Sequence, residues 1–190
     1  YKITFGGQDE QMNDAFFKLS GALALAIVLV YMVMAGQFES FLYPFIIMFS
    51  VPLTAIGIIF GLLVSFQPLG VGSLVGMLIL TGIVVNNAIV LVDYINKLRA
   101  TGMDTRSAIL EAGPVRLRPI LMTALTTILG LVPLSLGFGE GTEIQQPMAI
   151  VIVFGLSVAT FITLVFIPVV YYLIDNRRKK RTDKKEEIEA

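Results

Sequence analysis

The sequence predicts an all-α membrane protein, a bundle of five transmembrane helices. Hydrophobic residues fill 56% of the 190 positions and the mean hydropathy is +0.83, values typical of a polytopic membrane protein and not of a soluble domain. The charged residues gather in a few short stretches, and the apolar segments between them come close to the roughly 20 residues that cross hydrocarbon. The predicted spans are 16–35, 41–66, 69–96, 119–136 and 147–174.

Residues 1–14 precede the first span and are more polar than the span itself. Tyr1, Ile3 and Phe5 alternate with polar residues before a Gly-Gly pair, a pattern that predicts a short strand. Because a lone strand is not stable, we expect it to complete a sheet whose other strands lie in sequence outside this chain. The acidic stretch 8–14 is expected to be a solvated lead-in to the first helix.

The second predicted span contains features that shape a helix within a membrane. It follows the turn sequence GQFES at 36–40. Pro52 should kink it, because proline has no N–H to give to the carbonyl one turn earlier. Gly57 and Gly61, four residues apart, would let a neighbouring backbone approach closely, and are therefore predicted helix-packing residues.

The third span, 69–96, is the segment around which the rest is organised. Asn86 and Asn87 lie at its middle, where an unpartnered amide costs a few kcal/mol. They therefore need partners on other helices or in a water-filled cavity, which makes this an interior helix. At about 100° per residue its small and polar residues share one face. That face holds Gly72, Gly76, Ile79, Gly82, Ile83, Asn86, Val90 and Asp93, and the opposite face holds Leu78, Val85 and Val92.

This face has two interpretations, which the sequence leaves open. The Asn pair is either structural glue between helices or part of an ion or substrate pathway, since intramembrane polar groups often mark such pathways. Gly72 and Gly76 are predicted to be packing residues, because a gating role would require evidence of movement. The opposite apolar face suits either lipid or an apolar neighbour.

Residues 97–118 are predicted to be a polar loop containing one short helix. Asp104 is a candidate N-cap, and Gly113-Pro114 is expected to end the helix. The fourth span carries threonines that can donate to carbonyls of their own helix, at positions 123, 126 and 127.

The fifth span ends in aromatic and charged residues. Tyr171 and Tyr172 suit a membrane interface. The tail 176–190 is charged and has no aromatic residues, so we expect a disordered juxtamembrane end with some attraction to anionic lipids.

The cations predict the orientation of the bundle. Five lie in the 97–118 loop and seven between 177 and 185, whereas only Lys2 and Lys18 lie on the other side. The positive-inside rule then places the loop and tail in the cytoplasm and the N-terminus outside. A chain that starts outside the membrane with an odd number of spans and no signal peptide is expected to be part of something larger.

The sequence contains no His and no Cys. This excludes disulfides, the usual zinc sites and Cys or His catalytic pairs, so we expect neither an enzyme nor a cofactor or metal site. Any proton carrier would have to be a carboxylate or a water held by hydroxyls and amides.

Three stretches occur together and in order: GQFESFLYPFIIMFSVPL at 36–53, GIVVNNAIVLVDYIN at 82–96 and RLRPILMTALTTILGLVPL at 116–134. They resemble the C-terminal half of resistance-nodulation-division efflux pumps, specifically the hydrophobe/amphiphile (acriflavine-resistance) multidrug branch. The resemblance covers almost the whole chain and includes FGGQDEQM before the first span.

The resemblance implies a pump of the bacterial inner membrane with twelve transmembrane helices in two repeats, of which this chain would hold the last five. Residues 1–14 would then end an extracytoplasmic porter domain, and 15–175 would form the transmembrane bundle. Such pumps are homotrimers that exchange protons for drugs. The implied partners are the N-terminal half of the pump, a periplasmic adaptor, an outer-membrane channel and membrane lipids, with no nucleic acid.

The resemblance also implies a proton pathway. In this family a lysine of the central helix pairs with two aspartates of the first half, and that lysine position falls on Asn86. Because an amide can hydrogen-bond a carboxylate but cannot neutralise it, we expect partner aspartates here to be harder to ionise. Asn87 would line the same interior. A threonine and an arginine of the next helix correspond to Thr123 and Arg116.

Each of these assignments has a plainer alternative. The Thr123 hydroxyl could bond only within its own helix, and Arg116 could simply anchor the start of a helix. Asp93, two turns from Asn86, is either a proton exit or a solvated interface charge. The function implied is drug/proton antiport. The alternatives are a protein-export-type subunit of the same superfamily and a packing fragment without transport of its own. The substrate cannot be read from these residues.

Overall fold

The computed structural model describes the backbone of residues 8–138 and 141–189 and the side chains of 12–138 and 141–177. Every regular element in this part is helical. The helices are α1 (Gln8–Phe38), α2 (Leu42–Met48), α3 (Ser50–Val64), α4 (Val71–Ala100), α5 (Thr105–Ser135) and α6 (Gln145–Glu189). The strand predicted at 1–5 lies outside the described residues.

In the part that the structure describes, five helices are long and apolar enough to span a membrane, which confirms the predicted transmembrane bundle. The second of them is divided into α2 and α3 by Phe49. The break lies one turn before Pro52, which offers no N–H to the carbonyl of Met48. The break thus lies one turn before the proline that was predicted to disturb this helix.

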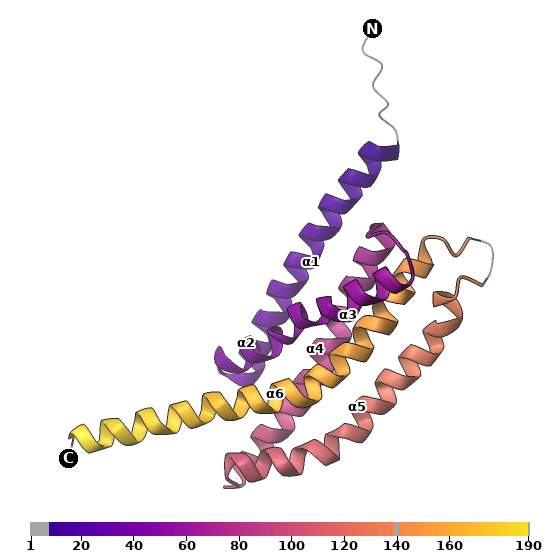
Figure 1. The fold of residues 1–190 in the computed structure, drawn as a ribbon. Coiled ribbons are helices and arrows are strands. Elements are labelled where there is room, and N and C mark those ends of the chain that lie inside the picture. The colour runs from indigo at the N-terminus through magenta and orange to yellow at the C-terminus, as the bar shows by residue number, and fades with distance from the viewer. Residues whose placement is uncertain (1–7, 139–140, 190) are drawn as a thin grey trace.

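Helix α4 is the centre of the bundle, as predicted. Within the described ranges it contacts all the other helices, and none of the others does so (Figure 1). Half of its most apolar stretch is buried, compared with 6% for α1, which stands at the periphery. Val85 and Val92 belong to a buried cluster, so the apolar face of α4 meets protein neighbours.

The glycine pairs lie where helices meet α6. A Cβ added at Gly57 would lie 2.7 Å from the Phe154 carbonyl oxygen, and one at Gly61 would lie 2.6 Å from the Phe154 Cβ. On α4, a Cβ at Gly76 would lie 2.8 Å from the Met148 carbonyl oxygen, and one at Gly72 would overlap the carbonyl oxygen of Ile144. All four positions are thus too close to α6, or to Ile144 directly before it, for a larger side chain.

The predicted loop 97–118 and its stop at Gly113-Pro114 are wrong. Helix α4 continues to Ala100, and α5 begins at Thr105 and runs through Pro114 without a break. A proline removes only one helical hydrogen bond of its own, so a long helix can continue across it and bend, as the curve of α5 in Figure 1 shows. The predicted N-cap is confirmed, since the Asp104 carboxylate accepts the backbone N–H of Arg106 at 3.3 Å.

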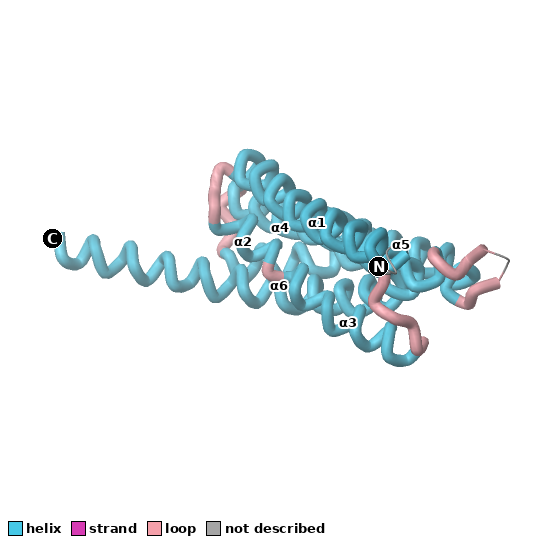
Figure 2. The backbone as a smooth tube through the Cα atoms, turned by 90° about the horizontal axis from the view of Figure 1, so that it is seen from above, coloured by secondary structure: helices cyan, strands magenta, loops and turns pink. Residues whose placement is uncertain are grey.

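Both outer ends are more helical than predicted. Helix α1 already includes the acidic lead-in 8–14, and α6 continues to Glu189 where a disordered tail was expected from 176. Figures 1 and 2 show this last part of α6 extending beyond the other helices. The tail is rich in Lys, Arg and Glu and contains no Gly or Pro, a composition that favours helix.

Candidate transport site on helix α4

The two adjacent amides of α4 have different surroundings. Asn87 is buried, with 8% of its surface exposed, whereas Asn86 is exposed on the side of α4 that faces α1. Asn86 lines a groove of about 290 Å³ between these two helices. Its other walls are apolar or glycine: Leu29, Val30, Val33, Met34, Gly82, Val85 and Ile89.

No hydrogen bond among the described side chains involves Asn86. An amide beside aliphatic walls at membrane depth is unfavourable unless a polar group or water meets it. The α1–α4 groove therefore presents a donor and an acceptor that these helices do not themselves satisfy. The predicted face of small and polar residues on α4 is therefore divided. Gly72 and Gly76 pack against the start of α6, while Gly82 and Asn86 remain exposed.

The threonines of α5 bond within their own helix, as predicted. The Thr123 Oγ1 donates to the Ile120 carbonyl at 2.9 Å, and Thr127 donates to the Thr123 carbonyl at 2.9 Å. Thr126 donates to Met122 at 2.8 Å. The Thr123 hydroxyl is on the exposed side of α5, so its oxygen remains able to accept a further hydrogen bond.

Arg116 connects α5 to α4. Its guanidinium carbon lies 4.5 Å from the centroid of the Tyr94 ring, within cation–π range. Its Nε is buried and has no hydrogen-bond partner among the described groups. The residue therefore does more than anchor a helix start, because part of the cation is held between two helices.

Asp93 pairs with Lys97 on the same helix, with 2.7 Å between the Asp93 Oδ2 and the Lys97 Nζ. Both side chains are more than a third exposed, which is the geometry of a solvated i,i+4 pair. Among the described residues, no hydrogen bond, ion pair or ring contact joins Asn86 to Thr123, Arg116 or Asp93. The structure does not assemble the predicted pathway residues into one connected site.

The structure contains a polar network that the sequence reasoning missed, at the end of α4. Arg99 forms an ion pair with Asp175 of α6 at 2.9 Å and donates to the Tyr171 Oη at 3.0 Å. Tyr171 in turn donates to the Asn96 Oδ1 at 2.5 Å, and the Thr105 hydroxyl donates to Asp175 at 2.5 Å. This network, called the Arg99 network below, joins α4, α5 and α6.

Tyr171 was predicted to suit the membrane interface, but its side chain packs inside the bundle and does not face the surface. Only 1% of its surface is exposed, and its ring stacks on Tyr43 of α2 with centroids 5.4 Å apart. Tyr172, 39% exposed, does lie on the surface. The sequence did contain a signal for the ion pair of the Arg99 network, because Arg99 and Asp175 have opposite charges and end two apolar spans on the same side of the bundle.

Five membrane-length helices, with a central one that offers an amide to an apolar groove, are features typical of the membrane-embedded part of a transport protein. No group of three or more His, Cys, Asp or Glu side chains gathers in the described part of the chain. Residues 1–175 match the model of the AcrB/AcrD/AcrF family, and the chain belongs to this family of resistance-nodulation-division efflux proteins.

The names of the similar proteins mention more than one class of exported compound. The chain is 45% identical over 186 residues to the swarming motility protein SwrC of Bacillus subtilis, covering 97% of this chain and 18% of SwrC. It is 40% identical to the multidrug resistance protein MdtC of Erwinia tasmaniensis, covering 82% of this chain and 15% of MdtC. A crystal structure of a heavy metal efflux pump aligns with a TM-score of 0.81 at 35% identity, covering 90% of this chain and 17% of that one. The chain thus spans less than a fifth of these proteins.

Proposed function

We propose that this chain contributes the second-repeat helices of the proton pathway in a drug/proton antiporter of the inner membrane, which exports hydrophobic or amphiphilic compounds. The proposal is for a transporter and not an enzyme. Its main support is the position of Asn86, which faces an apolar groove without a partner from these helices. The family match and the similarity to a multidrug resistance protein are consistent with it.

The missing partner of Asn86 is proposed to be a carboxylate from a first-half helix. The amide N–H groups can donate to a carboxylate oxygen, and the apolar walls of the α1–α4 groove would strengthen that bond by excluding water. An amide brings no charge, so a carboxylate here would bind its proton more readily than one beside a lysine. Asn87, Thr123 and Arg116 are proposed to line the polar interior between the two repeats of the complete pump. Asp93 is proposed to lie near the cytoplasmic end of that interior.

The rest of the assembly belongs to the same proposal. Helix α4 ends and α5 begins at the side of the bundle where most cations of the sequence gather, which we assign to the cytoplasm. A homotrimer with a periplasmic adaptor and an outer-membrane channel is proposed from the family resemblance.

The decisive experiment is Asn86→Leu in the full-length pump. We expect drug export to be lost while the trimer still assembles, because leucine keeps the volume and removes the donor and acceptor. Asn86→Gln should retain part of the activity. Ile79→Leu, an exposed apolar exchange two turns earlier on α4, is the matched control. Unchanged drug resistance in cells that express Asn86→Leu would reject the role of this amide.

A second variant tests the sign of the electrostatic argument. Asn86→Lys would place a cation beside the proposed carboxylate and stabilise its ionised form. The acid limb of the transport rate against pH should then move to lower pH, because the carboxylate loses its proton at lower pH. Proton-coupled dye efflux in proteoliposomes measures this shift. An unchanged acid limb, or a shift to higher pH, would contradict the proposal that a carboxylate faces residue 86.

Metal-cation export is the second candidate, favoured by the alignment with a heavy metal efflux pump. Growth of a pump-deficient strain carrying the full-length gene, with drugs and separately with metal salts, would distinguish the two cargoes. Proton flux by this chain alone in liposomes would separate a self-sufficient pathway from a packing fragment. We expect no flux, since Asn86 lacks its partner here.

A further inference from the structure

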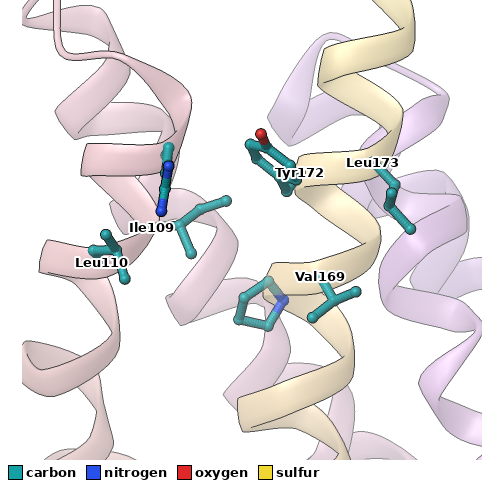
Figure 3. Close-up of a pocket in the computed structure, with 7 residues that line it drawn as sticks. Ile109, Leu110, Val169, Tyr172 and Leu173 are labelled. Atoms are coloured by element: carbon teal, nitrogen blue, oxygen red, sulfur yellow. The ribbon is translucent and has the colours of Figure 1, made fainter.

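A second groove lies far from Asn86, between the start of α5 and the later part of α6. Its volume is about 380 Å³, and its walls are mainly apolar. Ile109 and Leu110 of α5 face the segment of α6 that carries Val169 and Leu173, and Figure 3 shows the Tyr172 ring between the two helices. The function proposed above makes no use of this α5–α6 groove.

The polar end of this groove is cationic. Arg106 lines it one turn before Leu110, and no ion pair among the described side chains includes Arg106. Arg177 lies one turn beyond Leu173, on the same face of α6 by helical register. Each wall thus has aliphatic residues along its length and an arginine at the same end.

Two carboxylates near the start of α5 and in the later part of α6, Asp104 and Asp175, do not line the groove and have partners elsewhere. Asp104 accepts the backbone N–H of Arg106 as the N-cap of α5. Asp175 pairs with Arg99 and accepts the hydroxyl of Thr105, which directs it into the bundle. Among the residues that line the α5–α6 groove, Arg106 is the one with a charge at neutral pH, so the charge offered to a molecule there is positive.

We propose that the α5–α6 groove binds an anionic phospholipid of the surrounding membrane. One acyl chain would lie between the aliphatic residues of α5 and α6, and the phosphate would meet the Arg106 guanidinium. Tyr172 is exposed, and tyrosine is a residue type whose hydroxyl commonly meets lipid headgroups at a membrane interface. A lipid fits better than a wholly apolar cargo, because one end of the groove is charged and lies at the end of two membrane helices.

The test uses the full-length protein in nanodiscs of equal parts phosphatidylglycerol and phosphatidylcholine, with a diazirine on the acyl chain of one lipid at a time. We expect phosphatidylglycerol to label the peptides around Ile109 and Val169 about fivefold more than phosphatidylcholine. Equal labelling by the two lipids, or labelling only at other surfaces, would overturn the proposal. Absence of labelling because another part of the protein fills the groove would overturn it as well.

Two sets of variants, one at arginines and one at leucines, identify the groups responsible. Arg106→Gln should reduce the preference to about one, and Arg106→Lys should keep it. Arg118→Gln, an exposed arginine of α5 outside the groove, is the matched control. Leu173→Trp should reduce labelling by both lipids by filling the groove, while Leu129→Trp on exposed α5 should not. An unchanged preference in Arg106→Gln, or unchanged labelling in Leu173→Trp, contradicts the proposal.

Discussion

Two polar regions of α4 contrast in how their groups are satisfied. The Arg99 network is complete within this chain, since Arg99, Tyr171 and Asp175 all find partners on neighbouring helices. Asn86, more than three turns away on the same helix, faces an apolar groove without a partner. Both regions place polar groups in membrane-length helices, so residue type alone does not show which region is satisfied and which is open.

The difference separates structural from functional polarity. A partly buried ion pair with its hydrogen bonds complete, such as Arg99 and Asp175, holds helices together and fixes their register. An amide left open among aliphatic walls contributes no such stability to these helices, so its presence requires another explanation. The contrast predicts that substitutions in the two regions affect different properties.

The largest effect on stability is expected from Asp175→Asn. The substitution leaves the Arg99 cation, 27% exposed, without its counter-ion, which should lower the free energy of unfolding by about 3 kcal/mol. Unfolding by SDS from mixed micelles, followed by circular dichroism, measures the change. Asp93→Asn, in the solvated pair with Lys97, is the control and should cost at most about 0.5 kcal/mol. Equal losses for the two variants would mean that the Arg99 network is not a structural clamp.

An intermediate effect is expected from Gly76→Ala. Its new methyl group would meet the Met148 carbonyl oxygen at 2.8 Å, forcing α4 and α6 apart at a cost of about 1–3 kcal/mol. Gly130→Ala is the matched control on α5, where a Cβ meets nothing within 4 Å. There the better helix propensity of alanine should stabilise by about 0.5–1 kcal/mol. The same titration reads both variants, and changes of the same sign would contradict the packing argument.

The smallest effect on stability is expected from Asn86→Leu in this chain, within about 0.5 kcal/mol of the unsubstituted chain. The reason is that no hydrogen bond among the described side chains is lost. Measured beside Asp175→Asn, this variant decides the comparison. A destabilisation as large as that of Asp175→Asn would show that the amide is structural glue after all.

The sequence was a good guide to features set by local chemistry. Apolar length located five membrane helices, Pro52 located the break at Phe49, and Asp104 was recognised as a helix cap. Residues such as these act on their own helix within one turn, so their effect can be read without a partner.

The sequence was a poor guide to features set by distant contacts. Arg99 and Tyr171 are 72 positions apart, and although the opposite charges of Arg99 and Asp175 suggest an ion pair, no local pattern indicates that Tyr171 joins it. The local sequence of Tyr171 is typical of an interface residue. Its burial is due to Tyr43 and Asn96, which lie far from it in the sequence. Continuation of α5 through Pro114 was missed for a similar reason, because packing of α5 against α4 and α6 outweighs one lost hydrogen bond.

The close contacts near the two ends of α4 also indicate which helix of the bundle is held in place. One end is held where Gly72 and Gly76 touch the α6 backbone, and the other where Arg99 meets Asp175. At 1.5 Å per residue, Asn86 lies about 15 Å along the helix axis from Gly76 and about 20 Å from Arg99. Because α4 is held near both ends, we expect Asn86 to keep its position in the membrane, so that a helix carrying its partner would be the element that moves.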